Sequence, residues 1–201
     1  MKEPYITSTE LGVKIDENSF LFFDLDGTLV DTNFANYLSY MDAIRTVLQT
    51  DANIPYNPNE RFDRVSLNRF FPNLSEKELE KMVQCKENNY EEHLAQTTLI
   101  TKTSDLLSQY CTTNKTVLVT NCREKRATET LNFHGLFEKF NYMFFRQTAV
   151  DGSRINKFEN ALEILKIPPT SVVVFENEKS EIVDAIQAGI SADKIVKIHF
   201  K

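Results

Sequence analysis

The segment Phe20–Val30, FLFFDLDGTLV, constrains what this chain can fold into more than any other segment. Four apolar residues, Phe20 to Phe23, stop abruptly at two carboxylates, Asp24 and Asp26, which are separated by one leucine. A short apolar run bounded by a turn is typical of a strand buried in a parallel sheet. Open α/β sheets bind ligands in the crevice outside the carboxyl ends of such strands. The pattern therefore predicts two acids at a functional edge, and their mutual repulsion indicates a cation or a proton between them.

The rest of the chain supports a parallel sheet, because apolar runs alternate with helical patterns. Helical periodicity covers Glu124–Asn132, before His134-Gly135, and Lys157–Leu165, before Pro168-Pro169, so both patterns end at residues that stop helices. Strands that alternate with helices indicate βαβ units. Besides Phe20–Phe23, the predicted strands are Thr116–Thr120, Tyr142–Phe145, Val172–Phe175 and Ile195–Phe200.

Residues 33–114 interrupt this alternation with a stretch that has little strand character. Asn36–Leu48 carries an apolar helical face, and Ser75 with Glu78 forms a capping box that predicts a helix running through Glu92. We therefore expect an α/β core made of residues 1–32 and 115–201, with a helical insertion at residues 33–114.

Composition narrows the partners and the compartment. The chain has 201 residues and a formal charge of −6 without a long basic block, so nucleic acid and anionic membrane are poor candidates for a main partner. No stretch reaches the roughly 18 apolar residues of a membrane span, and the amino terminus lacks the apolar core of a signal peptide. The three cysteines lack metal-ligand spacing, which favours free thiols and a cytoplasmic protein.

Asp-x-Asp-Gly-Thr directly after four apolar residues resembles the first motif of the haloacid dehalogenase-like (HAD) superfamily, and within it the helical-cap phosphatases similar to phosphoglycolate phosphatase. The resemblance implies a Rossmann-like parallel-sheet core with an inserted all-helical cap. It also implies that Asp24 attacks phosphorus to form an aspartyl-phosphate, and that Asp26 is the general acid/base. Relatives that cleave carbon–halogen bonds lack the second Asp, so Asp26 favours phosphoryl transfer.

The second and third motifs of this superfamily are also matched in order along the chain. The resemblance implies that Thr120, at a strand end, hydrogen-bonds the transferring phosphoryl group, and that Lys157 neutralises both this group and the nucleophile. Asn121 is a candidate donor to the phosphate. Arg123 is a candidate contact for an anionic substrate, with a solvated residue at a helix start as the alternative.

The fourth motif is altered. Relatives commonly place an Asp that binds Mg²⁺ after this strand, whereas this chain reads Glu176-Asn177-Glu178. The expected Mg²⁺ ligands are Asp24, the Asp26 carbonyl, Asn177 and Glu176, the last either directly or through water. An amide oxygen brings no charge, so we expect weaker metal binding than in these relatives.

Cap residues select the substrate in this superfamily. Arg61, Arg64 and Arg69 lie in the region where relatives place such residues, and a cluster of arginines can bind a second anionic group. Arg64 is the best single candidate for a substrate contact. A solvated basic segment explains the three arginines equally well.

The expected function is a magnesium-dependent phosphatase that acts on a small phosphorylated metabolite through an aspartyl-phosphate, as a monomer or small homo-oligomer. A phosphomutase is a related alternative, because a substrate hydroxyl could intercept the phospho-enzyme. Asn177 motivates an alternative of another class, a non-catalytic or weakened phosphate-binding protein that keeps the fold.

Overall fold

The computed structural model describes residues 11–199, which form two compact units. Unit 1 contains the chain up to Val30 and again from Leu99, and unit 2 contains Asp31–Thr98. Residues 1–10, 200 and 201 lie outside the described part, and with them most of the amino-terminal segment considered for a signal peptide and Phe200 of the last predicted strand. The domain limits predicted from the sequence, 32/33 and 114/115, remain a prediction.

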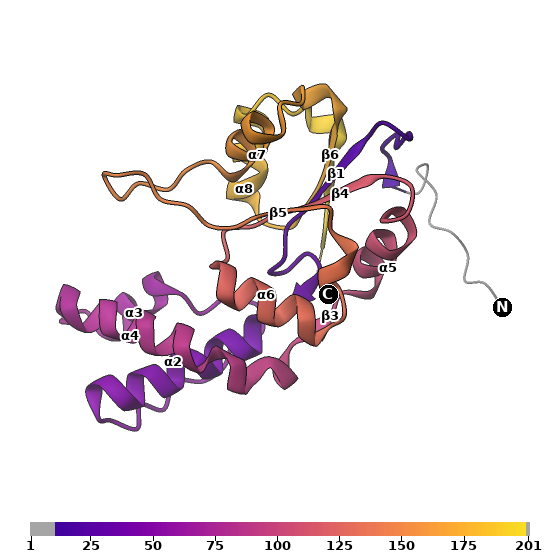
Figure 1. Ribbon diagram of the computed structural model, residues 1–201. Coiled ribbons are helices and arrows are strands. Elements are labelled where there is room, and N and C mark those ends of the chain that lie inside the picture. Colours follow the sequence, from indigo (N-terminus) through magenta and orange to yellow (C-terminus); the bar gives the residue numbers. More distant parts are fainter. Residues whose placement is uncertain (1–10, 200–201) are drawn as a thin grey trace. The chain divides into compact units, whose positions relative to one another are not determined.

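A five-stranded parallel sheet with the order β5-β4-β1-β6-β7 forms the centre of unit 1 (Figure 1). In chain order its strands are β1 Phe20–Phe23, β4 Lys115–Val119, β5 Tyr142–Phe144, β6 Val172–Glu176 and β7 Ile195–Lys197. β1 is the central strand, with Phe23 opposite both Leu118 and Phe175. The predicted strands are confirmed: β1 matches at both ends, and no end of the other strands differs by more than three residues. The carboxyl ends of these parallel strands lie at one edge of the sheet.

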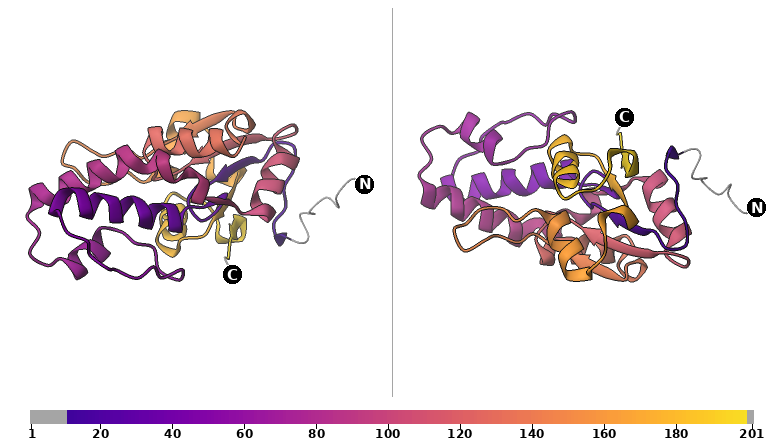
Figure 2. Two further views of the ribbon diagram at one scale, coloured as in Figure 1. Left: turned by 90° about the horizontal axis from the view of Figure 1, so that it is seen from below. Right: turned by 90° about the horizontal axis from the view of Figure 1, so that it is seen from above.

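Helices cover both faces of this sheet (Figures 1 and 2). They are α5 Thr101–Tyr110 and α6 Glu124–Phe133 on one face, and α7 Lys157–Leu165 and α8 Lys179–Gln187 on the other. Because successive strand residues point to opposite faces, Leu21 and Phe23 share a buried cluster with Leu107 of α5, whereas Phe22 packs with Phe158 of α7. The predicted α/β fold, with strands buried on both faces, is thus confirmed.

Short elements complete unit 1 and mark where the chain passes between the units. The two-stranded sheet of β2 Val30–Asp31 and β3 Thr98–Leu99 lies at these two crossings. Short 3₁₀ helices are η2 Phe137–Lys139, η3 Pro169–Ser171 and η4 Ala192–Lys194.

Unit 2 is helical, as the insertion was predicted to be. Its elements are α2 Asn33–Leu48, α3 Arg64–Phe70, α4 Glu76–Asn89 and the 3₁₀ helix η1 Tyr90–Gln96. The capping box of Ser75 and Glu78 forms as predicted at the start of α4. Ile44, Leu67 and Met82 come from α2, α3 and α4 and meet in one buried cluster, which holds the three helices together. No helix of residues 11–199 is long and apolar enough to cross a membrane.

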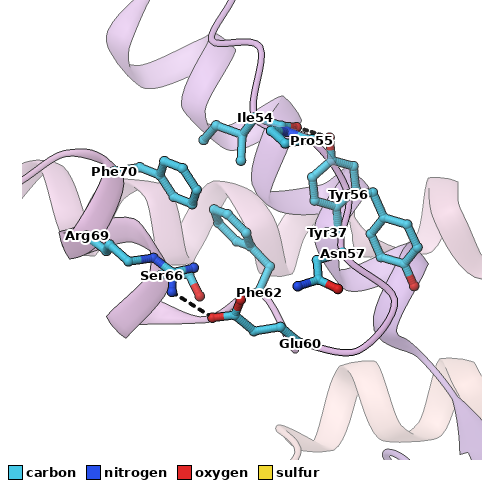
Figure 3. A pocket seen from close by; sticks show the side chains of 10 residues that line it. All are labelled: Tyr37, Ile54, Pro55, Tyr56, Asn57, Glu60, Phe62, Ser66, Arg69 and Phe70. Atoms are coloured by element: carbon cyan, nitrogen blue, oxygen red, sulfur yellow. Dashed lines mark hydrogen bonds and ion pairs between the residues drawn. The ribbon is translucent and has the colours of Figure 1, made fainter.

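A cavity of about 170 Å³ opens within unit 2 between α2, α3 and the loop that joins them (Figure 3). Aromatic rings supply much of its wall: Tyr37, Tyr56, Phe62 and Phe70. Arg69, one of the three arginines considered for substrate binding, lies at the cavity and forms an ion pair with Glu60 at 2.9 Å.

Candidate active site

The two acids of the first motif follow β1 directly and are both buried. The Asp24 N–H donates to the Phe175 carbonyl at 3.1 Å, so pairing with β6 extends one residue past the strand. Asp26 lies in the following turn, where Gly27 has a φ of 85° and donates to the Val30 carbonyl. A residue with a side chain would be strained at this φ. Asp24 and Asp26 are each 8% exposed, so neither charge is screened by much water.

Lys157, the first residue of α7, provides a buried cation beside Asp24. Its Nζ donates to Asp24 Oδ1 at 2.9 Å and to Glu176 Oε2 at 2.8 Å, and it lies 3.5 Å from Glu181 Oε2. Burial alone would lower the pKa of Lys157, but Asp24, Glu176 and Glu181 raise it above its ordinary value. The ammonium therefore stays charged and joins three carboxylates from distant parts of the chain.

The carboxylates beside Lys157 hold more negative charge than one ammonium balances. Burial raises the pKa of Asp24 above its ordinary value, an effect that Lys157 offsets only in part. Burial and then the charge of Asp24 also raise the pKa of Glu176. Both shifts show that the charged forms are penalised here, which a further cation or a bound proton would relieve.

Arg126, on the first turn of α6, forms a second buried ion pair, with Asp26. Its Nη1 donates to Oδ1 at 3.1 Å and its Nη2 to Oδ2 at 2.9 Å. The Arg126 side chain is 6% exposed and that of Asp26 is 8% exposed. Each acid of the first motif therefore has its own buried cation, Lys157 for Asp24 and Arg126 for Asp26.

The amide of Asn177 lies among oxygen atoms at the end of β6. With its nitrogen turned toward them, it is 3.2 Å from the Asp26 carbonyl, 3.2 Å from Glu176 Oε1 and 3.1 Å from Thr28 Oγ1. In the opposite orientation Asn177 Oδ1 accepts from the Thr28 hydroxyl at 3.1 Å and faces the other two oxygens. Glu176 is fully buried, and its Oε1 also accepts from the N–H groups of Asn177 and Glu178.

This set of oxygen atoms fits a hard divalent cation. A backbone carbonyl, a carboxylate oxygen and an amide oxygen are the ligands that Mg²⁺ and similar ions accept. Within residues 11–199, no group of three or more His, Cys, Asp or Glu side chains is arranged for a metal. A cation at this place would therefore depend on the Asp26 carbonyl and the Asn177 amide in addition to carboxylates.

A further set of polar contacts surrounds Glu181 of α8. Asn121 Nδ2 donates to Glu181 Oε2 at 2.7 Å, while Asn121 Oδ1 is buried and has no hydrogen-bond partner among residues 11–199. Arg154, in the loop before α7, forms ion pairs with Glu181 and Asp184. The Asn121 nitrogen thus already donates one hydrogen bond to Glu181, and the predicted role of Asn121 as a donor to the phosphate, from its backbone or its side chain, remains a prediction.

Thr120 follows β4 next to this cluster and is 1% exposed. Its N–H donates to the Phe144 carbonyl at 2.9 Å, and its Oγ1 accepts from the Cys122 N–H at 3.1 Å. The hydroxyl hydrogen can still be donated, because an accepting oxygen keeps its own proton. This is the capacity that binding of a phosphoryl oxygen requires.

Unit 1 thus contains most of the site residues predicted from the sequence. Lys157 contacts Asp24 and Glu176 directly, and Asn177 lies against the Asp26 carbonyl. Arg123 is exposed at the start of α6, and Arg64 is exposed at the start of α3 in unit 2. Their roles in substrate binding remain predictions.

The sequence interpretation missed Arg126, Arg154 and Thr28. Arg126 stands beside Ala127 on the inward side of α6, four residues before the buried Thr130. Two polar residues at helical spacing on an otherwise apolar helix face indicate that they have polar partners in the protein interior. The identity of that partner, Asp26, depends on folding across 100 positions of sequence separation.

Comparison with known proteins decides which family this arrangement represents. A family model described as haloacid dehalogenase-like hydrolase matches residues 21–193, most of the chain. The chain belongs to the haloacid dehalogenase-like hydrolases. The resemblance inferred from the first motif is thus confirmed, and the protein is a HAD-like hydrolase. A search of curated proteins gives no match.

Solved structures share the fold of this HAD-like hydrolase. A predicted phosphoglycolate phosphatase from Haemophilus somnus is 20% identical with a TM-score of 0.69, covering 88% of this chain and 84% of its own. A protein described as a β-phosphoglucomutase from Thermotoga maritima is 21% identical with a TM-score of 0.62, covering 91% and 87%. A haloacid dehalogenase-like family hydrolase from Streptococcus pneumoniae is 17% identical with a TM-score of 0.65, covering 87% and 83%. At these identities the likeness establishes the fold.

Proposed function

We propose that this HAD-like hydrolase is a magnesium-dependent phosphatase that cleaves a small phosphomonoester through an aspartyl-phosphate on Asp24. The observation that carries the proposal is the Lys157 ammonium, buried and bound to both Asp24 and Glu176. A nucleophilic carboxylate must approach a phosphoryl group that is itself negatively charged. A fixed cation beside the nucleophile lowers the repulsion between the two.

In the first step, an Asp24 oxygen attacks phosphorus in line with the leaving oxygen. The bond from phosphorus to the leaving oxygen breaks, and the leaving oxygen takes a proton from Asp26, which has to enter this step as the neutral acid and not as the carboxylate of its ion pair with Arg126. In the second step, Asp26 removes a proton from a water molecule, which attacks the phosphorus of the aspartyl-phosphate and breaks its bond to Asp24. The two steps return both acids to their starting forms.

Two further residues would bind the transferring group. Lys157 would neutralise its equatorial oxygens, and the Thr120 hydroxyl would donate a hydrogen bond to one of them. Both side chains are held by the fold before any ligand arrives, because Lys157 is the first residue of α7 and Thr120 directly follows β4. Such preorganisation means that little rearrangement is needed during the reaction.

Asp24, the Asp26 carbonyl, Asn177 and Glu176 would hold Mg²⁺. When bound, the ion would shield the negative charge that gathers around the phosphoryl group. Asn177 would have to turn its oxygen toward the ion, whereas its nitrogen can now donate to the Asp26 carbonyl. That rotation and the missing charge support a weaker metal site than one with an aspartate.

The proposed substrate is a small phosphorylated metabolite. Asn121 remains a candidate donor to its phosphate, and Arg64 and Arg123 remain candidate contacts for other anionic parts of the substrate. The proposed compartment is the cytoplasm, because Cys85, Cys111 and Cys122 are all free thiols. We expect a monomer or a small homo-oligomer without nucleic acid as a partner.

Hydrolysis of p-nitrophenyl phosphate with and without added Mg²⁺ tests the proposal. We expect turnover that rises with Mg²⁺ and is lost in Asp24→Asn. Absence of turnover at every Mg²⁺ concentration would contradict the proposal, and so would undiminished turnover in Asp24→Asn.

A second candidate is a phosphate-binding protein of the same fold that does not turn its ligand over. The amide nitrogen of Asn177 against the Asp26 carbonyl favours it, because a donor at this place occupies the position of a metal ligand. Asn177→Asp separates the two functions. Activity that appears only in the variant supports the binding protein, whereas clear turnover by the wild type excludes it.

A further inference from the structure

Arg126 belongs to none of the four motifs that identify this site, yet it forms a bidentate ion pair with the proposed general acid/base. It reaches Asp26 from α6 across 100 positions of sequence, through two hydrogen bonds of 2.9 and 3.1 Å. The whole residue is 5% exposed. A long cationic side chain is rarely buried without a specific partner, and here the partner is Asp26.

The backbone around Asp26 does not determine where its carboxylate points. The turn is closed by main-chain hydrogen bonds, from the N–H groups of Thr28, Leu29 and Val30 to the Leu25 carbonyl. These bonds place the Cα of Asp26 and leave its side-chain torsions open. The planar guanidinium restricts these torsions, because a bidentate pair matches both the position and the plane of a carboxylate.

We propose that Arg126 is a positioning residue for the phosphoryl transfer described above, on which this inference depends: it holds the carboxylate of Asp26 in one fixed orientation beside Asp24. A carboxylate has about four lone-pair sites, and the bidentate pair uses two of them. The carboxylate held in this way is the form of Asp26 that takes a proton from the attacking water. Arg126 therefore acts through Asp26 without contacting the substrate.

Lys157 shows why a separate cation is needed at Asp26. Its ammonium contacts Asp24, Glu176 and Glu181, whereas Asp26 is paired with Arg126. The two acids of the motif must act at different places, one on phosphorus and one on an oxygen. Two cations from different helices, α7 and α6, hold the acids independently.

Kinetics of Arg126→Ala and Arg126→Lys, with p-nitrophenyl phosphate as the substrate, test this role. We expect Arg126→Ala to lower kcat by about 100-fold, the loss typical of a misplaced catalytic group, with KM changed less than about threefold. Arg126→Lys keeps the positive charge but lacks the planar guanidinium that binds both carboxylate oxygens, so it should recover only part of kcat. Lys125→Ala is the matched control, since Lys125 is exposed on the same turn and pairs with Glu129.

Guanidinium ions at concentrations that do not denature the protein provide the sharpest test. They should raise kcat of Arg126→Ala by at least about tenfold, because they can occupy the vacated site beside Asp26. They should not raise kcat of the wild type, of Lys125→Ala or of Asp26→Asn/Arg126→Ala. In a protein that already carries Asp26→Asn, adding Arg126→Ala should lower kcat by less than about threefold, because residues that act as one unit have non-additive effects.

Thermal unfolding of each variant separates positioning from folding. If Arg126→Ala does not fold, the same comparison is made with Arg126→Lys and with Asp26→Asn/Arg126→Met, which leaves no unpaired charge.

The inference is overturned if a folded Arg126 variant keeps kcat within about twofold of the wild type. It is also overturned if the losses in the Asp26→Asn background are fully additive. An inactive wild type would overturn the proposed function and this role together, whereas an active wild type that is indifferent to Arg126 overturns this role alone.

Discussion

Unit 1 and unit 2 differ in how far apart in the sequence the partners of their buried cations lie. In unit 1, Lys157 and Arg126 are buried and each contacts a carboxylate from a distant part of the chain. In unit 2, the buried Lys86 pairs with its sequence neighbour Glu87, whereas the Glu60–Arg69 ion pair has side chains 45% and 57% exposed. Aliphatic and aromatic side chains together form the interior of this unit. The contrast teaches that the buried ion pairs at the edge of the unit 1 sheet join distant segments of the chain, at a desolvation cost that a catalytic role would explain.

The largest effect is expected from Asp24→Asn, which removes the proposed nucleophile and leaves the fold unchanged. We expect kcat for p-nitrophenyl phosphate to fall by on the order of 10⁴-fold or more, with thermal stability similar to or above that of the wild type. Steady-state kinetics and a thermal melt measure both. Residual activity above one tenth of the wild-type value would show that Asp24 is not the nucleophile.

Lys157→Met should damage both function and folding, because it leaves two carboxylates buried without their cation. We expect kcat to fall by about 1,000-fold and the free energy of unfolding by about 3 kcal/mol. Urea denaturation measures the free energy of unfolding. Lys102→Met, at an exposed position of α5, is the matched control and should change neither quantity. Equal effects of the two substitutions would remove the distinction between buried and exposed charge.

Phe62→Ala tests the other half of the comparison, because Phe62 packs against the rings of Tyr37, Tyr40 and Phe70. We expect the stability of unit 2 to fall by about 3 kcal/mol, as for other large buried aromatic residues. Hydrogen exchange of the α2 and α4 amides reports this loss. The α7 and α8 amides should be unaffected, and faster exchange there would contradict separate interiors.

Asn177→Asp should strengthen Mg²⁺ binding by about tenfold, since a carboxylate adds a charge and cannot present an amide nitrogen to the Asp26 carbonyl. Calorimetric titration with Mg²⁺ measures this without any substrate. Asn18→Asp, on an exposed segment of unit 1, is a suitable control. Unchanged affinity in Asn177→Asp would place the cation elsewhere.

The smallest effect is expected from Glu60→Ala, which breaks the exposed pair with Arg69 at the cavity of unit 2. Exposed ion pairs contribute at most about 0.5 to 1 kcal/mol to stability, because water and salt screen them. Urea denaturation at low and high salt should therefore give nearly the same stability for this variant and the wild type. A loss of stability as large as that of Phe62→Ala would mean that the stability of unit 2 depends strongly on this exposed ion pair.

Much of the fold was predictable from local patterns. The run Phe20–Phe23 before two acids marks the central strand, and the capping box at Ser75 marks the start of α4. These features depend on residues within a few positions of each other. The core strands are largely apolar, which is the pattern that burial on both faces imposes.

The candidate site was predictable only where a motif supplied the residue. Asp24 and Lys157 match motifs of the family, and the fold places Lys157 Nζ 2.9 Å from Asp24 Oδ1. Arg126 and Arg154 match none, and their partners are set by the three-dimensional arrangement of helices around the sheet. The sequence also could not show that the Asn121 nitrogen is engaged by Glu181, because that contact spans 60 positions.

The claim that Asp24 forms a covalent phospho-enzyme can be tested directly by rapid acid quenching during turnover of a phosphorus-labelled aryl phosphate, followed by mass spectrometry of peptides. We predict a phosphoryl group on the peptide that contains Asp24, sensitive to hydroxylamine and absent in Asp24→Asn. Steady turnover without any labelled peptide, or label on a peptide that lacks Asp24, would contradict the account.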